Sequence, residues 1–236
     1  MYISLLFIMS NKYTLIIKNA ECYVEGSLVV TDIAIKDNII AKISKNITET
    51  ADKILDAKGL TVFPGIIDTQ VHFREPGDPN KETLESGSKA AVLGGVTAVF
   101  EMPNTSPPTD SPDRFQDKLD RAKGRMYCNY AFYYGATENN SSSLEVTKNL
   151  EGCCGIKMFV GSSTGNLLVK EDKYIEQVIK NAPRVVSIHS EDENMLNERK
   201  NEIVNGDVKS HYVWRNVETA MTSTRKVAKF AKALNK

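Results

Sequence analysis

The sequence predicts an α/β fold: an incomplete (β/α)8 barrel of the TIM type, with about five βα units, preceded by a small β module. From residue 61 onward, short apolar runs alternate about five times with helical patterns, which is typical of a parallel α/β fold. Residues 13–60 instead read as short strands separated by turns. Polar side chains follow the predicted barrel strands, where a barrel enzyme builds its active site. We therefore expect two domains, an incomplete β-sandwich module over residues 1–60 and a partial barrel over residues 61–236.

The β module is predicted from four apolar segments with strand character. Turn residues at Glu25–Gly26 and Lys36–Asn38 separate these segments. The predicted strands are Thr14–Ile17, Ser27–Val30, Ile33–Ile35 and Ile39–Ile43.

The barrel pattern begins with the apolar run Leu60–Ile67, which we interpret as a buried strand. The first helix is expected to end at Gly94-Gly95, a glycine stop. The four further predicted strands are Val96–Met102, Tyr130–Tyr134, Gly155–Val160 and Arg184–Ile188. The predicted helices are Thr83–Leu93, Asp113–Ala122, a weak one at Ser143–Leu150, Asp172–Lys180, Glu191–Asn205 and Val217–Leu234.

Composition narrows the class of protein. The formal net charge is zero and 25% of the residues are charged, which argues against a nucleic-acid or anionic-membrane partner. The four cysteines form no CxxC pair, so we expect a reducing, cytoplasmic location. The apolar segment Met1–Ile8 is too short to span a bilayer, and Met9 is the expected true start.

Two of the three histidines, His72 and His189, each come directly after a predicted strand. In a parallel barrel such positions share the C-terminal face, and imidazole is the commonest ligand of catalytic zinc. A lone histidine after a strand is more often a loop residue. Because these two would share a face with Lys157 and Asp68, the pattern favours a metal site.

Lys157 interrupts an otherwise apolar strand. A buried lysine must lose its charge, find a partner or be modified. Alternatively, Lys157 points between the sheet and the helices, with its amine reaching solvent. Periodicity alone does not choose between these two placements.

Arg74 and Asn104 are the candidate substrate-binding residues. Arg74 follows His72 by two residues, and its planar guanidinium suits a carboxylate. Asn104 follows the second barrel strand and offers both a donor and an acceptor. For each of them, an ordinary hydrogen bond within a loop is an equally good explanation.

Four segments together resemble the motifs of dihydroorotases in the amidohydrolase superfamily, and they occur in that family's order. The Phe-Arg-Glu-Pro-Gly sequence at the end of the first segment favours dihydroorotase over the allantoinase and hydantoinase relatives. The segments are Gln70–Gly77, Glu101–Thr105, Gly155–Gly165 and Ile188–Glu193.

The resemblance implies a role for each candidate residue. His72 and His189 would be metal ligands, and Lys157, carboxylated on its amine, would bridge two zinc ions. Arg74 and Asn104 would hold the carboxylate of the substrate. The implied reaction is the reversible interconversion of dihydroorotate and N-carbamoyl-aspartate in pyrimidine biosynthesis.

The sequence departs from this pattern in two places. Gln70 stands where the family has a histidine ligand, so the sequence is compatible with a site for one metal ion as well as with a site for two. A further histidine ligand and the general-base aspartate of the family would lie beyond Lys236, so we assign no general base. We expect a truncated chain that is inactive alone. The alternatives are one half of a split enzyme, or a non-catalytic scaffold that forms a homo-oligomer or binds aspartate transcarbamoylase.

Overall fold

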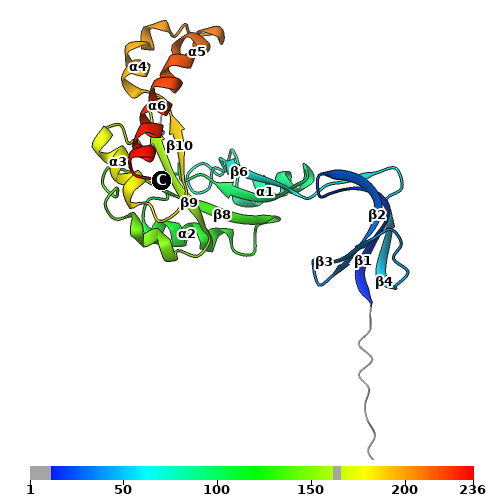
Figure 1. Cartoon of the computed structure of the whole chain (residues 1–236). Helices are drawn as coiled ribbons and strands as arrows, with labels where there is room; N and C mark the ends of the chain where they lie inside the picture. Colours follow the sequence, from blue (N-terminus) through cyan, green and yellow to red (C-terminus); the bar gives the residue numbers. More distant parts are fainter. Residues whose placement is uncertain (1–11, 162–165) are drawn as a thin grey trace, which may run out of the picture. The chain divides into compact units, whose positions relative to one another are not determined.

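The computed structural model describes residues 12–161 and 166–236, which divide into two compact units (Figure 1). The first unit is Met1–Gly65 and the second is Ile66–Lys236, called the half-barrel unit below. The predicted start at Met9 and residues 162–165 of the third motif lie outside the described residues.

The first unit is a five-stranded sheet in the order β3-β2-β1-β4, with the short β5 also paired to β1. Its hairpins turn at Glu25-Gly26 and Asp37-Asn38, and all four residues have positive φ, as tight hairpin turns require. The second layer of the predicted sandwich stays a prediction. The strands are β1 (Tyr13–Val24), β2 (Ser27–Lys36), β3 (Ile39–Ser44), β4 (Ala51–Asp56) and β5 (Thr61–Val62).

The half-barrel unit contains a curled parallel sheet in the order β10-β9-β8-β7-β6, which confirms the predicted fold class. Each strand pairs with the next one along the chain, as in a barrel wall. The strands are β6 (Ile66–Val71), β7 (Val96–Glu101), β8 (Asn129–Gly135), β9 (Cys153–Val160) and β10 (Val186–Ser190).

The helices of this unit follow the strands in chain order. The helix expected at residues 143–150 is a 3-10 helix, η1 (Leu144–Asn149). The α-helices are α1 (Leu84–Leu93), α2 (Pro112–Ala122), α3 (Asp172–Asn181), α4 (Glu193–Glu198), α5 (Lys209–Trp214) and α6 (Val217–Ala233), and a second 3-10 helix, η2 (Lys200–Glu202), follows α4.

The prediction of a buried first strand at Leu60–Ile67 was wrong. Thr61–Val62 belongs to the sheet of the first unit, and β6 begins only at Ile66. Pro64, which has no backbone N–H to donate, stands between the two strands, so the apolar run cannot form one continuous ladder. Ile66 and Ile67 are each 58% exposed, so apolar composition alone did not indicate burial.

One face of the parallel sheet forms the main core. Ile156, Met158 and Val160 of β9 lie in one buried cluster with Phe115 of α2 and Ile175 of α3. The alternate residues of β9 therefore point to the opposite face, away from the helices. This alternation fixes the direction of the side chains discussed below.

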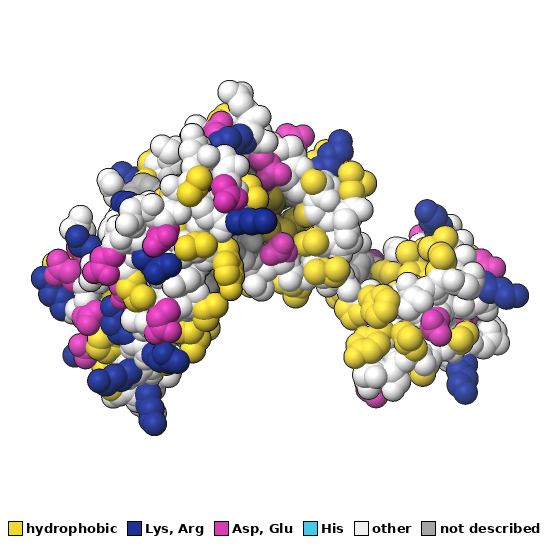
Figure 2. Space-filling view, turned by 90° about the horizontal axis from the view of Figure 1, so that it is seen from above, with side chains coloured by type: hydrophobic (Ala, Val, Ile, Leu, Met, Phe, Trp, Pro, Cys, Tyr) yellow, Lys and Arg dark blue, Asp and Glu magenta, His cyan; other side chains and the backbone are white. Residues whose placement is uncertain are grey.

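The surface of both units carries apolar side chains among charged ones (Figure 2). In the half-barrel unit, Val185 and Val208 are 76% and 87% exposed. None of the helices in the described parts of the chain is long and apolar enough to cross a membrane.

A reciprocal cap starts α1 on the loop that follows the first motif. Thr83 Oγ1 accepts from Ser86 N–H (3.0 Å), and Ser86 Oγ accepts from Thr83 N–H (2.9 Å). We expect Thr83→Ala to lower the free energy of unfolding by about 1 kcal/mol, because a backbone N–H loses its acceptor. Urea unfolding followed by circular dichroism measures this loss. Thr83→Ser keeps the hydroxyl and is the matched control, so equal losses in both variants would contradict the capping role.

Candidate functional site

His72 directly follows β6 and is half-buried. Its Nδ1 lies 2.8 Å from Asn104 Oδ1. Because a carbonyl oxygen can only accept, Nδ1 carries the proton and Nε2 keeps its lone pair. Asn104 therefore orients the His72 ring, a contact that the sequence did not indicate.

Lys157 is 2% exposed and lies on the face of β9 opposite the main core. This placement decides between the two orientations that periodicity left open. Its Nζ lies 5.2 Å from the centroid of the Phe159 ring. Among the described residues it has no hydrogen-bond or ion-pair partner, and burial lowers the pKa of its amine.

His189 lies on β10, in register with Phe159 of β9, while Lys157 pairs with Ser187. Residues in register on parallel strands point to the same face, so His189 and Lys157 share a face of the sheet. The rings of Phe159 and His189 lie 6.2 Å apart. The two strands thus bring an imidazole and a buried amine to one side of the half-barrel unit.

Electrostatics link His72 to this group. Burial lowers the pKa of His72, and the hydrogen bond with Asn104 opposes that change. The positive charges of Arg74, Lys157 and His189 also lower its pKa, so these four side chains lie within electrostatic reach of one another. A neutral His72, the form that binds a metal, is favoured.

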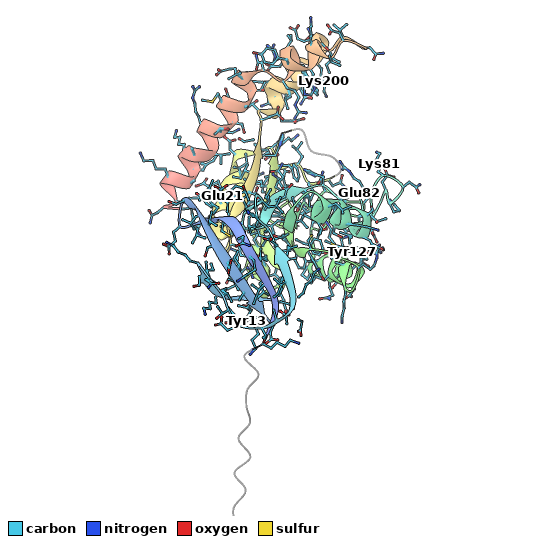
Figure 3. The ribbon with its side chains drawn as sticks, turned by 90° about the vertical axis from the view of Figure 1, so that its right-hand side faces the viewer. Tyr13, Glu21, Lys81, Glu82, Tyr127 and Lys200 are labelled. Atoms are coloured by element: carbon cyan, nitrogen blue, oxygen red, sulfur yellow. The ribbon has the colours of Figure 1, made fainter. Side chains whose placement is uncertain are left out.

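A cavity of about 490 Å³ opens beside Asn104 and Arg74, both of which line it. Lys81, on the loop before α1 and labelled in Figure 3, also lines the cavity, as does Asp78, with which it pairs at 3.0 Å. A guanidinium, an ammonium and an amide around one cavity suit a ligand that carries a carboxylate.

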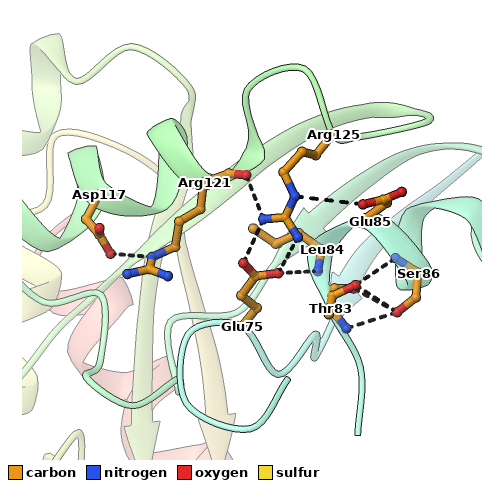
Figure 4. A network of polar contacts seen from close by, with 8 residues as sticks. All are labelled: Glu75, Thr83, Leu84, Glu85, Ser86, Asp117, Arg121 and Arg125. Atoms are coloured by element: carbon orange, nitrogen blue, oxygen red, sulfur yellow. Dashed lines mark hydrogen bonds and ion pairs between the residues drawn. The ribbon is translucent and has the colours of Figure 1, made fainter. Parts of the chain in front are cut away.

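Polar contacts of Glu75, the residue after Arg74, hold this loop in place (Figure 4). Arg125 donates to both carboxylate oxygens of Glu75, at 2.7 and 3.0 Å. Glu75 Oε2 also accepts from the backbone N–H of Leu84 at the start of α1 (3.0 Å). The hydrogen bond from Arg125 holds the pKa of Glu75 below its ordinary value.

A buried ion pair holds the segment that leads to Asn104. Glu101, the last residue of β7, contacts Lys118 of α2, and the side chains of both are at most 1% exposed. Lys118 Nζ also donates to the carbonyl of Met102 (3.0 Å). Burial raises the pKa of Glu101 to about 7, against the opposing effect of Lys118.

Glu191 lies two residues beyond His189 and contacts it directly. His189 Nε2 lies 2.7 Å from Glu191 Oε2. Arg215 donates to both oxygens of Glu191, with Nε 2.9 Å from Oε1. Burial raises the pKa of Glu191, but the hydrogen bonds from Arg215 and His189 outweigh burial, so the pKa lies below its ordinary value.

Gln70, where the resemblance predicts a histidine ligand, is exposed on β6, and its backbone N–H donates to Asp68 Oδ1 (2.9 Å). In the described part of the chain, no group of three or more His, Cys, Asp or Glu side chains could hold a metal ion. The candidate donors that the sequence predicted are the imidazoles of His72 and His189 and the Lys157 amine.

Sequence reasoning missed the residues that hold the candidate side chains in place: Asn104 in its contact with His72, Glu75 with Arg125, Glu101 with Lys118, and Glu191 with Arg215. One signal was available, because Glu191 follows His189 by two residues at the end of a strand, where such side chains share a side. Arg215 lies 24 residues further on, and no local pattern connects it to Glu191.

Comparisons with known proteins show what this chain is similar to. A family model described as "Amidohydrolase family" matches residues 61–234. The dihydroorotase of Methanosarcina mazei is 36% identical over 199 residues, which are 83% of this chain and 43% of that protein. The dihydroorotase of Lactobacillus helveticus is 34% identical over 187 residues, which are 77% of this chain and 42% of that protein. The chain thus spans less than half the length of these curated relatives.

Among solved structures, the L-hydantoinase (dihydropyrimidinase) of Arthrobacter aurescens matches with a TM-score of 0.87 and 25% identity. The match covers 94% of this chain and 51% of that one. The D-hydantoinase of a Thermus species also matches, with a TM-score of 0.76 and 25% identity over 94% of this chain and 50% of that one.

Proposed function

Since the chain belongs to the amidohydrolase family, we propose that it carries the metal-holding and carboxylate-binding part of a dihydroorotase-type cyclic amidohydrolase. The observation that carries the proposal is the group formed by His72, Lys157 and His189, with Arg74 and Asn104 lining the cavity beside it. The proposed reaction interconverts dihydroorotate and N-carbamoyl-aspartate, in pyrimidine biosynthesis.

The family implies a metal cofactor, commonly zinc, and the donors of this chain fit one. Two imidazoles supply two ligands, whereas a catalytic zinc site has three from the protein. Lys157 is buried without a hydrogen-bond or ion-pair partner among the described residues, so its amine is suited to carboxylation, which would provide oxygen ligands. We propose one or two zinc ions held by His72, Lys157 and His189, with Gln70 as a weak further donor.

The residues of this chain would bind and orient the substrate. Arg74 would bind the substrate carboxylate through its two-pronged guanidinium, with Asn104 beside it in the cavity. Asn104 would also keep His72 in the tautomer whose Nε2 faces a metal. A bound metal would act as a Lewis acid on the ring amide.

We assign no general base among the described residues, where no group of three or more His, Cys, Asp or Glu side chains could hold a metal ion, so a second zinc ion would need further ligands. We therefore propose that this chain is inactive alone and needs further ligands and a base from another segment or chain. Removing a general base alone typically slows a reaction about 10²–10⁴-fold.

Zinc binding and turnover test these two proposals separately. The purified chain is expected to bind zinc and to give no turnover of dihydroorotate. His72→Ala should weaken zinc binding in calorimetry, and the control is His211→Ala on α5, where the His211 ring packs against Trp214. A chain that binds no zinc would refute the metal site, while zinc-dependent turnover would refute inactivity.

Partners are tested by co-expression. Co-expression with the C-terminal half of a dihydroorotase should restore turnover if the chain is one half of a split enzyme, and failure to associate would count against that proposal. A scaffold that binds aspartate transcarbamoylase is the alternative, and a pull-down that recovers none of that enzyme would contradict it.

A further inference from the structure

We propose that Glu191 and Arg215 are positioning residues that fix His189 in the tautomer with its proton on Nε2, leaving Nδ1 as the metal-binding nitrogen. This inference rests on the proposed function for the metal, but its central claim concerns the His189 ring alone. It is carried by the contacts of Glu191 with His189, Arg215 and Val160, and by the approach of Arg215 to His189.

The distance between His189 and Glu191 decides where the proton lies. His189 Nε2 is 2.7 Å from Glu191 Oε2, a hydrogen-bond distance between an imidazole nitrogen and a carboxylate. An ionised carboxylate only accepts, so the contact needs a proton on Nε2. In the neutral ring, Nδ1 then carries the lone pair, and no described residue bonds to it.

Arg215 fixes the carboxylate. Its guanidinium donates to both oxygens of Glu191, in the bidentate geometry that restricts a carboxylate most. The Glu191 side chain is 12% exposed and that of Arg215 is 21% exposed, so solvent screens the pair only in part. Glu191 is thereby aimed at His189 rather than at solvent.

The backbone of Glu191 is also fixed. Its N–H donates to the carbonyl of Val160 at the end of β9 (2.8 Å). A Cβ at Gly161, where φ is +94°, would lie 2.4 Å from the carbonyl oxygen of Glu191. Only glycine therefore fits at position 161, where the chain passes close to the Glu191 carbonyl, and the hydrogen bond to Val160 ties the Glu191 main chain to the end of β9.

Arg215 also determines what happens when the carboxylate is removed. Its Nη2 lies 3.5 Å from His189 Nε2, the same nitrogen that contacts Glu191. In Glu191→Ala, the Arg215 guanidinium is the side chain that remains close to His189 Nε2, and a guanidinium can only donate hydrogen bonds. Nε2 would then become an acceptor, and the proton would move to Nδ1, the nitrogen that the metal needs.

The test is nitrogen NMR of the full chain without metal, which reads histidine tautomers directly. The chain has three histidines, so His72→Gln and His211→Gln assign the spectrum. With its ring neutral, His189 of the unsubstituted chain should carry the proton on Nε2, the nitrogen that lies 2.7 Å from Glu191. Glu191→Ala should show the proton on Nδ1, and Arg215→Met a mixture of tautomers, with Arg215→Lys partly restoring the original state.

Zinc affinity is the second readout. Glu191→Ala and Arg215→Met should each weaken zinc binding about 10–100-fold. Arg114→Met, on α2, removes a partly exposed ion pair with Asp110 and should change neither readout. An Nδ1-protonated His189 in the unsubstituted chain, or an unchanged tautomer in both variants, would overturn the inference. If the tautomers behave as expected but no form of the chain binds zinc, the positioning role is supported and the proposed metal site fails.

Discussion

Replacing Lys118 by methionine is expected to lower the free energy of unfolding of the half-barrel unit by about 3–5 kcal/mol. The reason is that Glu101, whose side chain is 1% exposed, keeps its carboxylate but loses the ammonium that compensates it. The carbonyl of Met102 also loses the hydrogen bond that Lys118 donates. Urea unfolding followed by helical circular dichroism reports this unit, because the described part of the first unit contains only strands and turns.

The loss caused by Lys118→Met should depend on pH. Burial already raises the pKa of Glu101 from 4.5 to about 7, and removing the ammonium raises it further. A carboxyl whose folded pKa exceeds its unfolded pKa binds more protons when folded, so stability falls as the pH rises above 4.5. The variant should therefore be least impaired at acid pH.

Two controls separate this effect from a general loss of packing. The double variant Glu101→Leu, Lys118→Met removes both charges and should recover most of the stability. Arg114→Met, on the same helix, breaks an exposed pair and should cost at most about 0.5 kcal/mol. A loss below about 1 kcal/mol for Lys118→Met would show that the pair is not buried in solution.

Glu75→Gln is expected to destabilise the half-barrel unit by about 1–3 kcal/mol at neutral pH. Glu75 accepts two hydrogen bonds from Arg125 and one from Leu84 N–H, and an amide can accept through only one of its two heteroatoms. The loop that carries Arg74 would lose its tie to α1. Chemical unfolding by circular dichroism measures the loss.

The pH dependence of this second effect has the opposite sign. The folded pKa of Glu75 is depressed below 4.5, chiefly by Arg125, so its stabilisation is complete above 4.5. It is lost as the pH falls through the folded pKa, and the difference between the two proteins should vanish in acid. Asp117→Asn is the matched control in the same network (Figure 4), because its pair with Arg121 is about half exposed. Equal losses in both variants would contradict the anchoring role.

Local patterns predicted most elements of the half-barrel unit because they depend on neighbours in the chain. Thr83 and Gly94 mark the ends of α1 in the sequence as they do in the structure. The prediction failed at Leu60–Ile67, where an apolar run was divided between two sheets around Pro64. It also missed β4, whose polar and apolar residues gave no clear strand pattern, and the short helix α5.

The sequence by itself determined the parallel α/β fold, the placement of His72 and His189 near the ends of barrel strands and that of Lys157 within a strand, because strands and their ends follow from local patterning. Only the tertiary structure decided that Lys157 faces away from the helices and that Arg215 reaches Glu191. Burial and pairing of charges depend on which segments meet across the sheet. A contact between side chains 24 residues apart has no periodic trace in the chain, since folding rather than local propensity brings them together.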